Sequence, residues 1–216
     1  MAHIHLEDGS FTLTWVLVWW ACAIILIGAA LWVLRRHRIT APGRITLAAF
    51  LTAAAFALFQ VSIPVFGGVH LNLTPLIGIL AGPVIGPLVV LIINILSAAI
   101  GHGGWGLIGA NVLVNMTEVV TAWAIFRGLK SMVPDLFSRA GIATIIALLC
   151  GNIVMILIIL VSGVQGVTQS PDQVLFGLSL IAAVNMGVAV VEAIVTGFVV
   201  AYIGKNRPDL LNEVKK

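Results

Sequence analysis

Five long apolar stretches restrict the folds that this sequence can adopt more than any other feature does. A helix needs about 20 residues to cross the hydrocarbon core of a bilayer, and each stretch is long enough. They are Phe11–Leu34, Ile45–Phe66, Trp105–Phe126, Ala140–Val161 and Val174–Ile203. Charged residues make up only 9 % of the chain and the mean hydropathy is +1.16, whereas soluble proteins carry about 25 % charged residues. We therefore predict an all-α integral membrane protein that forms a single membrane domain over residues 1–216.

A sixth apolar region, Leu73–Ile100, is interrupted by helix-breaking residues, which are Gly78, Gly82, Pro83, Gly86 and Pro87. As one helix this region would be about 42 Å long, and two full crossings need about 60 Å. If this region crosses the membrane and returns, one of its two segments, or legs, must therefore be short or partly extended. We predict a short leg over Leu73–Ala81 and a helical leg over Gly86–Ile100.

The 11 basic residues fall into three clusters, which predict the orientation. They are Arg35, Arg36, Arg38 and Arg44, then Arg127, Lys130 and Arg139, and then Lys205, Arg207, Lys215 and Lys216. Basic loops stay in the cytoplasm, so we predict seven transmembrane helices with the N-terminus outside and the C-terminus cytoplasmic. Residues 1–10 contain no Lys or Arg, unlike a cleaved signal peptide, and are expected to remain in the mature protein. Because the basic clusters are confined between apolar runs, we expect a lipid bilayer and no nucleic acid as surroundings.

The loops predicted to lie outside contain four histidines, His3, His5, His70 and His102, and no Lys or Arg. Such a surface favours a cation over an anion. Met1, Ala2 and His3 together offer an α-amine, two backbone amides and an imidazole, which can form fused chelate rings around Ni(II) or Cu(II). Zn(II) prefers a tetrahedral arrangement. The alternative is an exposed tail in which the pattern is accidental, and the tail pattern alone does not decide between the two.

Glu118 and Glu192 stand inside predicted spans, where an unpaired charge is costly. They are either a cation relay or hydrogen-bonded carboxyl groups that serve helix packing or partner contact. We favour packing, because the nitrogen ligands are expected on the other side of the membrane.

Ala49, Ala53 and Ala57 form a stripe of small residues at helical spacing, which permits close approach of another helix. The sequence contains no Gly-x-x-x-x-Gly-Lys-Ser/Thr loop. If transport is driven by ATP, another subunit must therefore hydrolyse it.

Several segments resemble a known family in the expected order: His3-Ile4 with Asp8-Gly9, Gly67-Gly68-Val69-His70-Leu71, Ala81-Gly82-Pro83, and Gly103-Gly104 through Gly109-Ala110-Asn111-Val112 to Asn115-Met116. The family is the substrate-binding (S) component of energy-coupling-factor transporters for nickel and cobalt, the CbiM/NikM group. The resemblance covers most of the chain.

This resemblance implies a six-helix core over residues 45–203, preceded by an extra helix over 11–34 and a metal-binding segment over 1–10. It implies that the terminal amine, the amide and imidazole of His3, and the imidazole of His70 hold the metal in a plane. The family begins Met-His, whereas this chain begins Met-Ala-His. If Met1 is removed, Ala2 supplies the amine; if it stays, the first three residues supply four nitrogens and could displace His70. We assign His5, His102 and Asn111 secondary positions around the metal.

The implied function is uptake of Ni(II), with Co(II) as a close competitor, in a prokaryotic cytoplasmic membrane. The implied partners are a transmembrane coupling subunit, which would meet the alanine stripe, two ATP-binding cassette ATPases, and in some members a small accessory membrane subunit. The protein itself would be a transporter subunit and not an enzyme. Alternatives are an S component for a small organic vitamin and a membrane enzyme or assembly subunit that uses Glu118 and Glu192.

Overall fold

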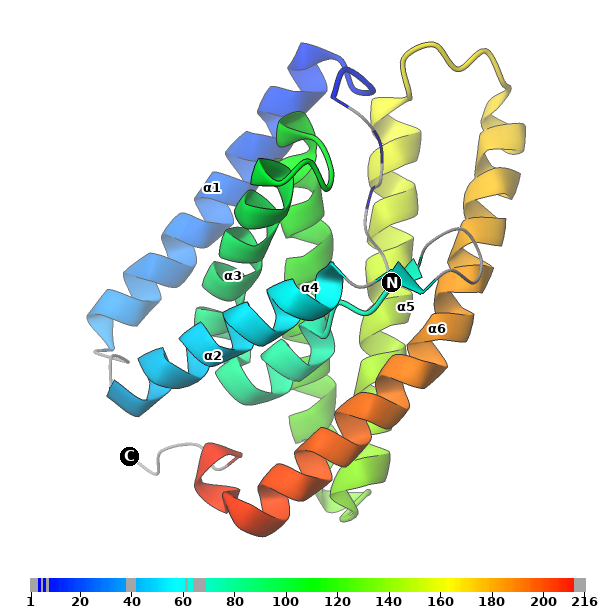
Figure 1. Ribbon diagram of the computed structural model, residues 1–216. Helices are drawn as coiled ribbons and strands as arrows, with labels where there is room; N and C mark the ends of the chain where they lie inside the picture. Colours follow the sequence, from blue (N-terminus) through cyan, green and yellow to red (C-terminus); the bar gives the residue numbers. More distant parts are fainter. Residues whose placement is uncertain are drawn as a thin grey trace.

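The computed structural model describes residues 4, 6, 8–37, 42–60, 62–63 and 69–211. Within these residues the chain forms six α-helices and one two-stranded antiparallel ribbon (Figure 1). The helices are α1 (Leu13–Arg36), α2 (Pro42–Phe59), α3 (Thr74–Ala99), α4 (Ile108–Gly128), α5 (Leu136–Ser162) and α6 (Pro171–Asn206), and the strands are β1 (Ser62–Ile63) and β2 (Val69–His70). All the helices except the shorter α2 are long and apolar enough to cross a membrane. The predicted helical membrane class is confirmed.

The helices α3, α4 and α5 form the middle of the bundle. Helix α1 packs against α3 and α4 on one side, α6 packs against α5 on the other, and α2 crosses obliquely over α3 (Figure 1). Large apolar side chains also cover the outside of the bundle, as at Ile24, Ile25 and Phe198, which are 62 %, 69 % and 65 % exposed. Such an outer surface suits contact with lipid acyl chains.

The interrupted apolar region forms α3, which is sharply kinked at Gly82. Gly82 has φ 74° and ψ −177°, a conformation that side chains disfavour and glycine adopts readily, and Pro83 follows it. The first leg, 74–81, rises about 12 Å, which is too short to cross a bilayer alone. A short leg, a break and a longer helical leg are therefore present where the sequence predicted them, although they form one kinked element.

The second predicted span is shorter than expected. Helix α2 ends at Phe59, where Gln60 N–H donates to the Ala57 carbonyl in a tight final turn. The chain then forms the ribbon, in which Ser62 pairs with His70 and Ile63 with Val69. The prediction of a helix through Phe66 was wrong because these residues pair with a later strand, which apolar length alone does not reveal.

The basic clusters meet at one end of the bundle. Figure 1 shows the end of α1, the beginning of α2 and the ends of α4 and α6 at this end. The first three carry Arg36, Arg44 and Arg127, and Arg207 directly follows α6. The loops that join α3 to α4 and α5 to α6 lie at the other end. The charge asymmetry that the sequence predicted is therefore a property of the folded bundle.

Candidate metal site

Ile4 is buried in the bundle against α4 and α5. Ile4 is 1 % exposed and packs with residues of α4 and α5, including Val114 and Met155. Its N–H donates to Asn111 Oδ1 at 2.8 Å, and Asn111 Nδ2 donates back to the Ile4 carbonyl at 3.3 Å. This paired hydrogen bonding fixes the backbone of Ile4 to α4, so Asn111 anchors the N-terminal segment.

A second anchor joins the N-terminal segment to the loop before α4. The Asp8 carboxylate accepts hydrogen bonds from Trp105 N–H at 3.1 Å and from Gly106 N–H at 2.8 Å. A Cβ atom at Gly104 would overlap the Asp8 carboxylate, so glycine there allows this approach. The Asp8-Gly9 and Gly103-Gly104 segments singled out in the sequence therefore meet in the structure.

His70 and His102 lie against each other. Their ring centroids are 4.6 Å apart and their planes meet at 85°. The Phe59 ring packs on both, at 5.6 Å from His70 and 4.9 Å from His102. The three side chains come from β2, from the loop between α3 and α4, and from the end of α2, and His70 is only 7 % exposed.

The loop that carries His102 is held by its own backbone, because His102 N–H donates to the Ser97 carbonyl at 2.9 Å. Burial lowers the pKa of His102 below its usual value of about 6.5. A neutral imidazole has a nitrogen lone pair, which can accept a hydrogen bond or bind a metal. Since the same loop contacts Asp8, it links the His70 side of the site to the N-terminal segment.

The remaining predicted ligands, Met1, Ala2 and His3, lie outside the described residues, as does His5. Within the part of the chain that the structure describes, no three His, Cys, Asp or Glu side chains are grouped closely enough to hold a metal ion. His70 and His102 therefore supply at most part of a ligand set.

The two buried glutamates meet the start of α3. The Glu118 carboxyl group accepts a hydrogen bond from the Thr74 hydroxyl, and Glu192 Oε2 accepts one from Asn72 N–H at 3.5 Å. Both glutamates are fully buried, and the N-terminal end of a helix favours nearby negative charge. These contacts support the interpretation that the two glutamates serve helix packing. Our reason for it, that the nitrogen ligands lie on the other side of the membrane, was wrong, because Asn72, which contacts Glu192, lies two residues beyond His70.

A small polar cavity adjoins the histidine pair through Phe59. It measures about 10 Å³ and is lined by polar side chains from three parts of the chain, which are Asn72, Thr74, Asn94, Ser97 and Asn115. Nδ2 of Asn72, Oγ of Ser97 and Oδ1 of Asn115 are buried with no hydrogen-bond partner among the described residues. The cavity is the size of about one water molecule, and sequence reasoning did not identify it.

The alanine stripe faces outward. Ala49, Ala53 and Ala57 are all exposed on one side of α2, whereas Ala55 is buried against the bundle. This surface is therefore available to another helix.

Comparison with known proteins decides the family. The family model described as the cobalt uptake substrate-specific transmembrane region, CbiM, matches residues 5–210. The chain belongs to the CbiM family. Membership of this transmembrane family, together with the apolar helices, makes it a multi-pass protein of a prokaryotic inner membrane.

Relatives of this CbiM-family chain carry names of transport proteins. A provisionally named cobalt transport protein, CbiM 1 of Methanocorpusculum labreanum, is 26 % identical over 98 % of this chain and 93 % of its own length. A provisionally named fused nickel transport protein, NikMN of Archaeoglobus fulgidus, is 27 % identical over 97 % of this chain and 68 % of its own length. The solved structure of a truncated transition metal transporter shares the fold, with a TM-score of 0.80 at 18 % identity over 94 % of this chain and 99 % of that one.

Proposed function

We propose that this chain is the substrate-binding subunit of an ATP-driven energy-coupling-factor transporter that takes up Ni(II) or Co(II). The proposal is carried by the loop between α3 and α4, which contacts both parts of the proposed site. Its Gly106 N–H donates to Asp8 of the N-terminal segment, and its His102 contacts His70. Membership of the CbiM family and the cobalt and nickel names of its relatives support these two cargoes.

In this proposal, once Met1 is removed, the amine of Ala2, the amide and imidazole of His3, and the imidazole of His70 bind the metal. If Met1 is retained, its amine, the amides of Ala2 and His3, and the His3 imidazole supply four nitrogens and compete with His70. Ile4 supports the proposal, because its backbone is held inside the bundle by Asn111 and the proposed ligands immediately precede it. His102 would orient the His70 ring, as residues around metal ligands commonly do. A nitrogen plane suits Ni(II), and Co(II) also accepts these donors.

The proposed topology counts the two legs of α3 separately and gives seven membrane elements, with α1 as the helix added to a six-helix core. The basic end of the bundle would face the cytoplasm, which places the N-terminus outside and the C-terminus inside. The coupling subunit would pack on the Ala49, Ala53 and Ala57 surface, two ATPases would supply energy, and a small accessory membrane subunit would complete some assemblies.

The size of the polar cavity favours an ion over an organic vitamin as cargo. Pockets for organic ligands measure about 300–1,000 Å³, and the cavity beside Phe59 measures about 10 Å³. A much larger cavity of about 400 Å³ exists, but Gly43 and Arg44 line it, at the other end of α2 from Phe59.

Isothermal titration calorimetry of the purified full chain with Ni(II) and Co(II) tests the proposal. We expect about one ion per chain, and loss of binding in His70→Ala and in a variant with residues added before Met1. His37→Ala is the matched control, because His37 is exposed at the end of α1. Thermal melting checks that each variant is folded. Unchanged affinity in both altered forms would exclude the site.

A further inference from the structure

A cavity of about 400 Å³ lies at the basic end of the bundle, away from the histidine pair. The beginning of α2, the kink of α3, the end of α4 and the short 3₁₀-helix η3 (Pro208–Leu210) surround it. Each of the three basic clusters of the sequence contributes one arginine to it, namely Arg44, Arg127 and Arg207. The metal site that we propose uses none of these residues.

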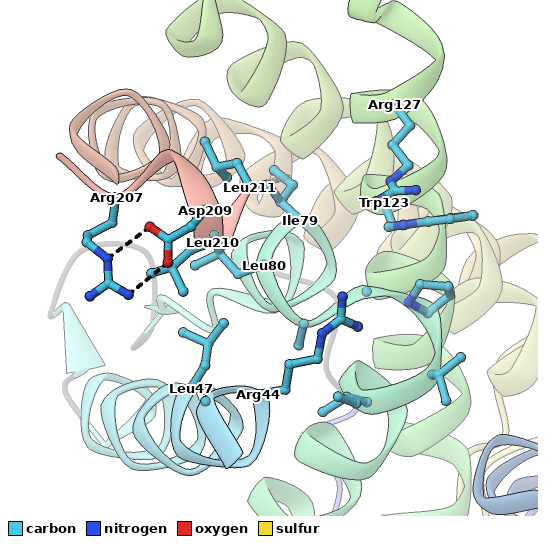
Figure 2. A pocket seen from close by; sticks show the side chains of 16 residues that line it. Arg44, Leu47, Ile79, Leu80, Trp123, Arg127, Arg207, Asp209, Leu210 and Leu211 are labelled. Carbon is cyan, nitrogen blue, oxygen red and sulfur yellow. Dashed lines mark hydrogen bonds and ion pairs between the residues drawn. The ribbon is translucent and has the colours of Figure 1, made fainter. Parts of the chain in front are cut away.

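Two of these arginines are directed into the cavity. Figure 2 shows the side chains of Arg44 and Arg127 extending toward the same space, with the Trp123 ring beside Arg127. The guanidinium carbon of Arg127 lies 5.1 Å from the centre of the Trp123 ring, a cation–π contact that restrains the orientation of the arginine. Both arginines are half-buried.

The third arginine is engaged elsewhere. Arg207 Nε and Nη2 donate to the two carboxylate oxygens of Asp209 at 2.9 and 2.8 Å, and Figure 2 shows this pair turned away from Arg44. Asp209 is the one acidic residue among the described residues that line the cavity, so its charge is matched by Arg207. Arg44 and Arg127 give the rest of the cavity a positive charge.

The other walls are apolar and include Leu47, Leu80 and Leu211. A cavity that joins two arginines to an apolar wall complements a ligand with a phosphate at one end and hydrocarbon at the other. Basic pockets between membrane helices at the cytoplasmic side bind anionic lipid headgroups, and arginine pairs bind phosphate through several N–H donors. We propose that this cavity binds the phosphate headgroup of an anionic membrane lipid.

Native mass spectrometry of the full chain, released from bilayers that contain equal amounts of phosphatidylglycerol and phosphatidylcholine, tests this site. We expect the wild-type chain to retain phosphatidylglycerol in preference to phosphatidylcholine. Arg44→Gln combined with Arg127→Gln should lower the bound fraction at least about tenfold. The matched control is Arg36→Gln, because Arg36 makes the same 5.1 Å contact with the Trp32 ring but lines no part of this cavity.

Four results would overturn the lipid proposal. The first is equal retention of both lipids by the wild-type chain, and the second is an equal loss in Arg36→Gln, which would indicate general surface charge. The third is complete displacement of the lipid by excess inorganic phosphate, which would make the ligand a free anion. If the double variant keeps its lipid but loses transport, the arginines contact a protein partner instead. Unchanged Ni(II) binding and thermal melting of the double variant would show that it is folded.

Discussion

His102 lies edge-on to His70, with ring centroids 4.6 Å apart, although one follows α3 and the other precedes it. The Phe59 ring packs against both imidazoles, so the three rings form one cluster. An imidazole packed against two aromatic neighbours has few alternative orientations, so His102 and Phe59 fix the ring of His70. The loop that supplies His102 is itself fixed to Asp8, which couples the orientation of His70 to the position of the N-terminal segment.

Replacing His102 tests whether it positions His70. We expect His102→Ala to weaken Ni(II) affinity by about 10–100-fold, the usual effect of losing a residue that orients a metal ligand. The stoichiometry should stay near one ion per chain, because the proposed ligands remain. Calorimetry measures both quantities. A complete loss of binding in a folded His102→Ala chain would make His102 a ligand, and unchanged affinity would remove it from the site.

Replacing Asn111 tests the anchor of the N-terminal segment. Asn111→Leu has a similar volume but removes both hydrogen bonds to the Ile4 backbone. We expect a loss of about 10–100-fold in Ni(II) affinity, since the segment that carries the proposed ligands is no longer held in place. Asn206→Leu is the control, because Asn206 Nδ2 donates to the Tyr202 carbonyl within its own helix. Equal affinities in the two variants would contradict the role of Asn111.

Metal binding is expected to depend on pH through the backbone. An amide nitrogen binds metal only after it loses its proton, so affinity should fall as the pH falls. Calorimetry in buffers of different ionisation enthalpy counts the protons released per ion. We expect at least one proton from a backbone amide. We expect a second proton if Met1 is retained and the amides of Ala2 and His3 both bind the metal. An affinity that stays constant from neutral to mildly acidic pH would contradict amide ligation.

The alanine stripe of α2 provides a test of partner contact that is separate from metal binding. We expect Ala53→Leu to leave Ni(II) binding by the purified chain unchanged, because Ala53 is exposed on the outward side of α2. Uptake of radioactive nickel by cells that contain the complete transporter should fall at least about tenfold, since leucine prevents close helix approach. Ala183→Leu, at an exposed alanine of α6, should transport normally. Equal uptake by the two variants would argue against this docking surface.

The elements that depend on chain length and charge could be predicted from the sequence. Helices occupy most of each predicted apolar stretch, and the break in α3 falls at Gly82, where glycine and proline adjoin. The three basic clusters meet at one end because α1, α4 and α6 all end there and α2 begins there. These features follow from local sequence and from the thickness of a bilayer.

The contacts that depend on the packing of distant segments could not be predicted. Nothing in the apolar stretch after Phe59 indicates that Ser62 pairs with His70, and the spacing of His70 and His102 does not reveal that their rings touch. Asn111 was named from the family resemblance, whereas its hydrogen bonds to Ile4 required the fold. Glu192 was placed too far from His70 because its contact with Asn72 N–H, two residues beyond His70, is a tertiary feature.

Anomalous diffraction at the nickel absorption edge, from crystals of the full chain grown with Ni(II), tests the central claim most directly. The account predicts a single strong peak at bonding distance from the imidazole of His70 and from the amine that begins the chain, inside the bundle beside Ile4. A peak remote from His70, or a chain terminus that extends into solvent while the metal is bound elsewhere, would contradict it.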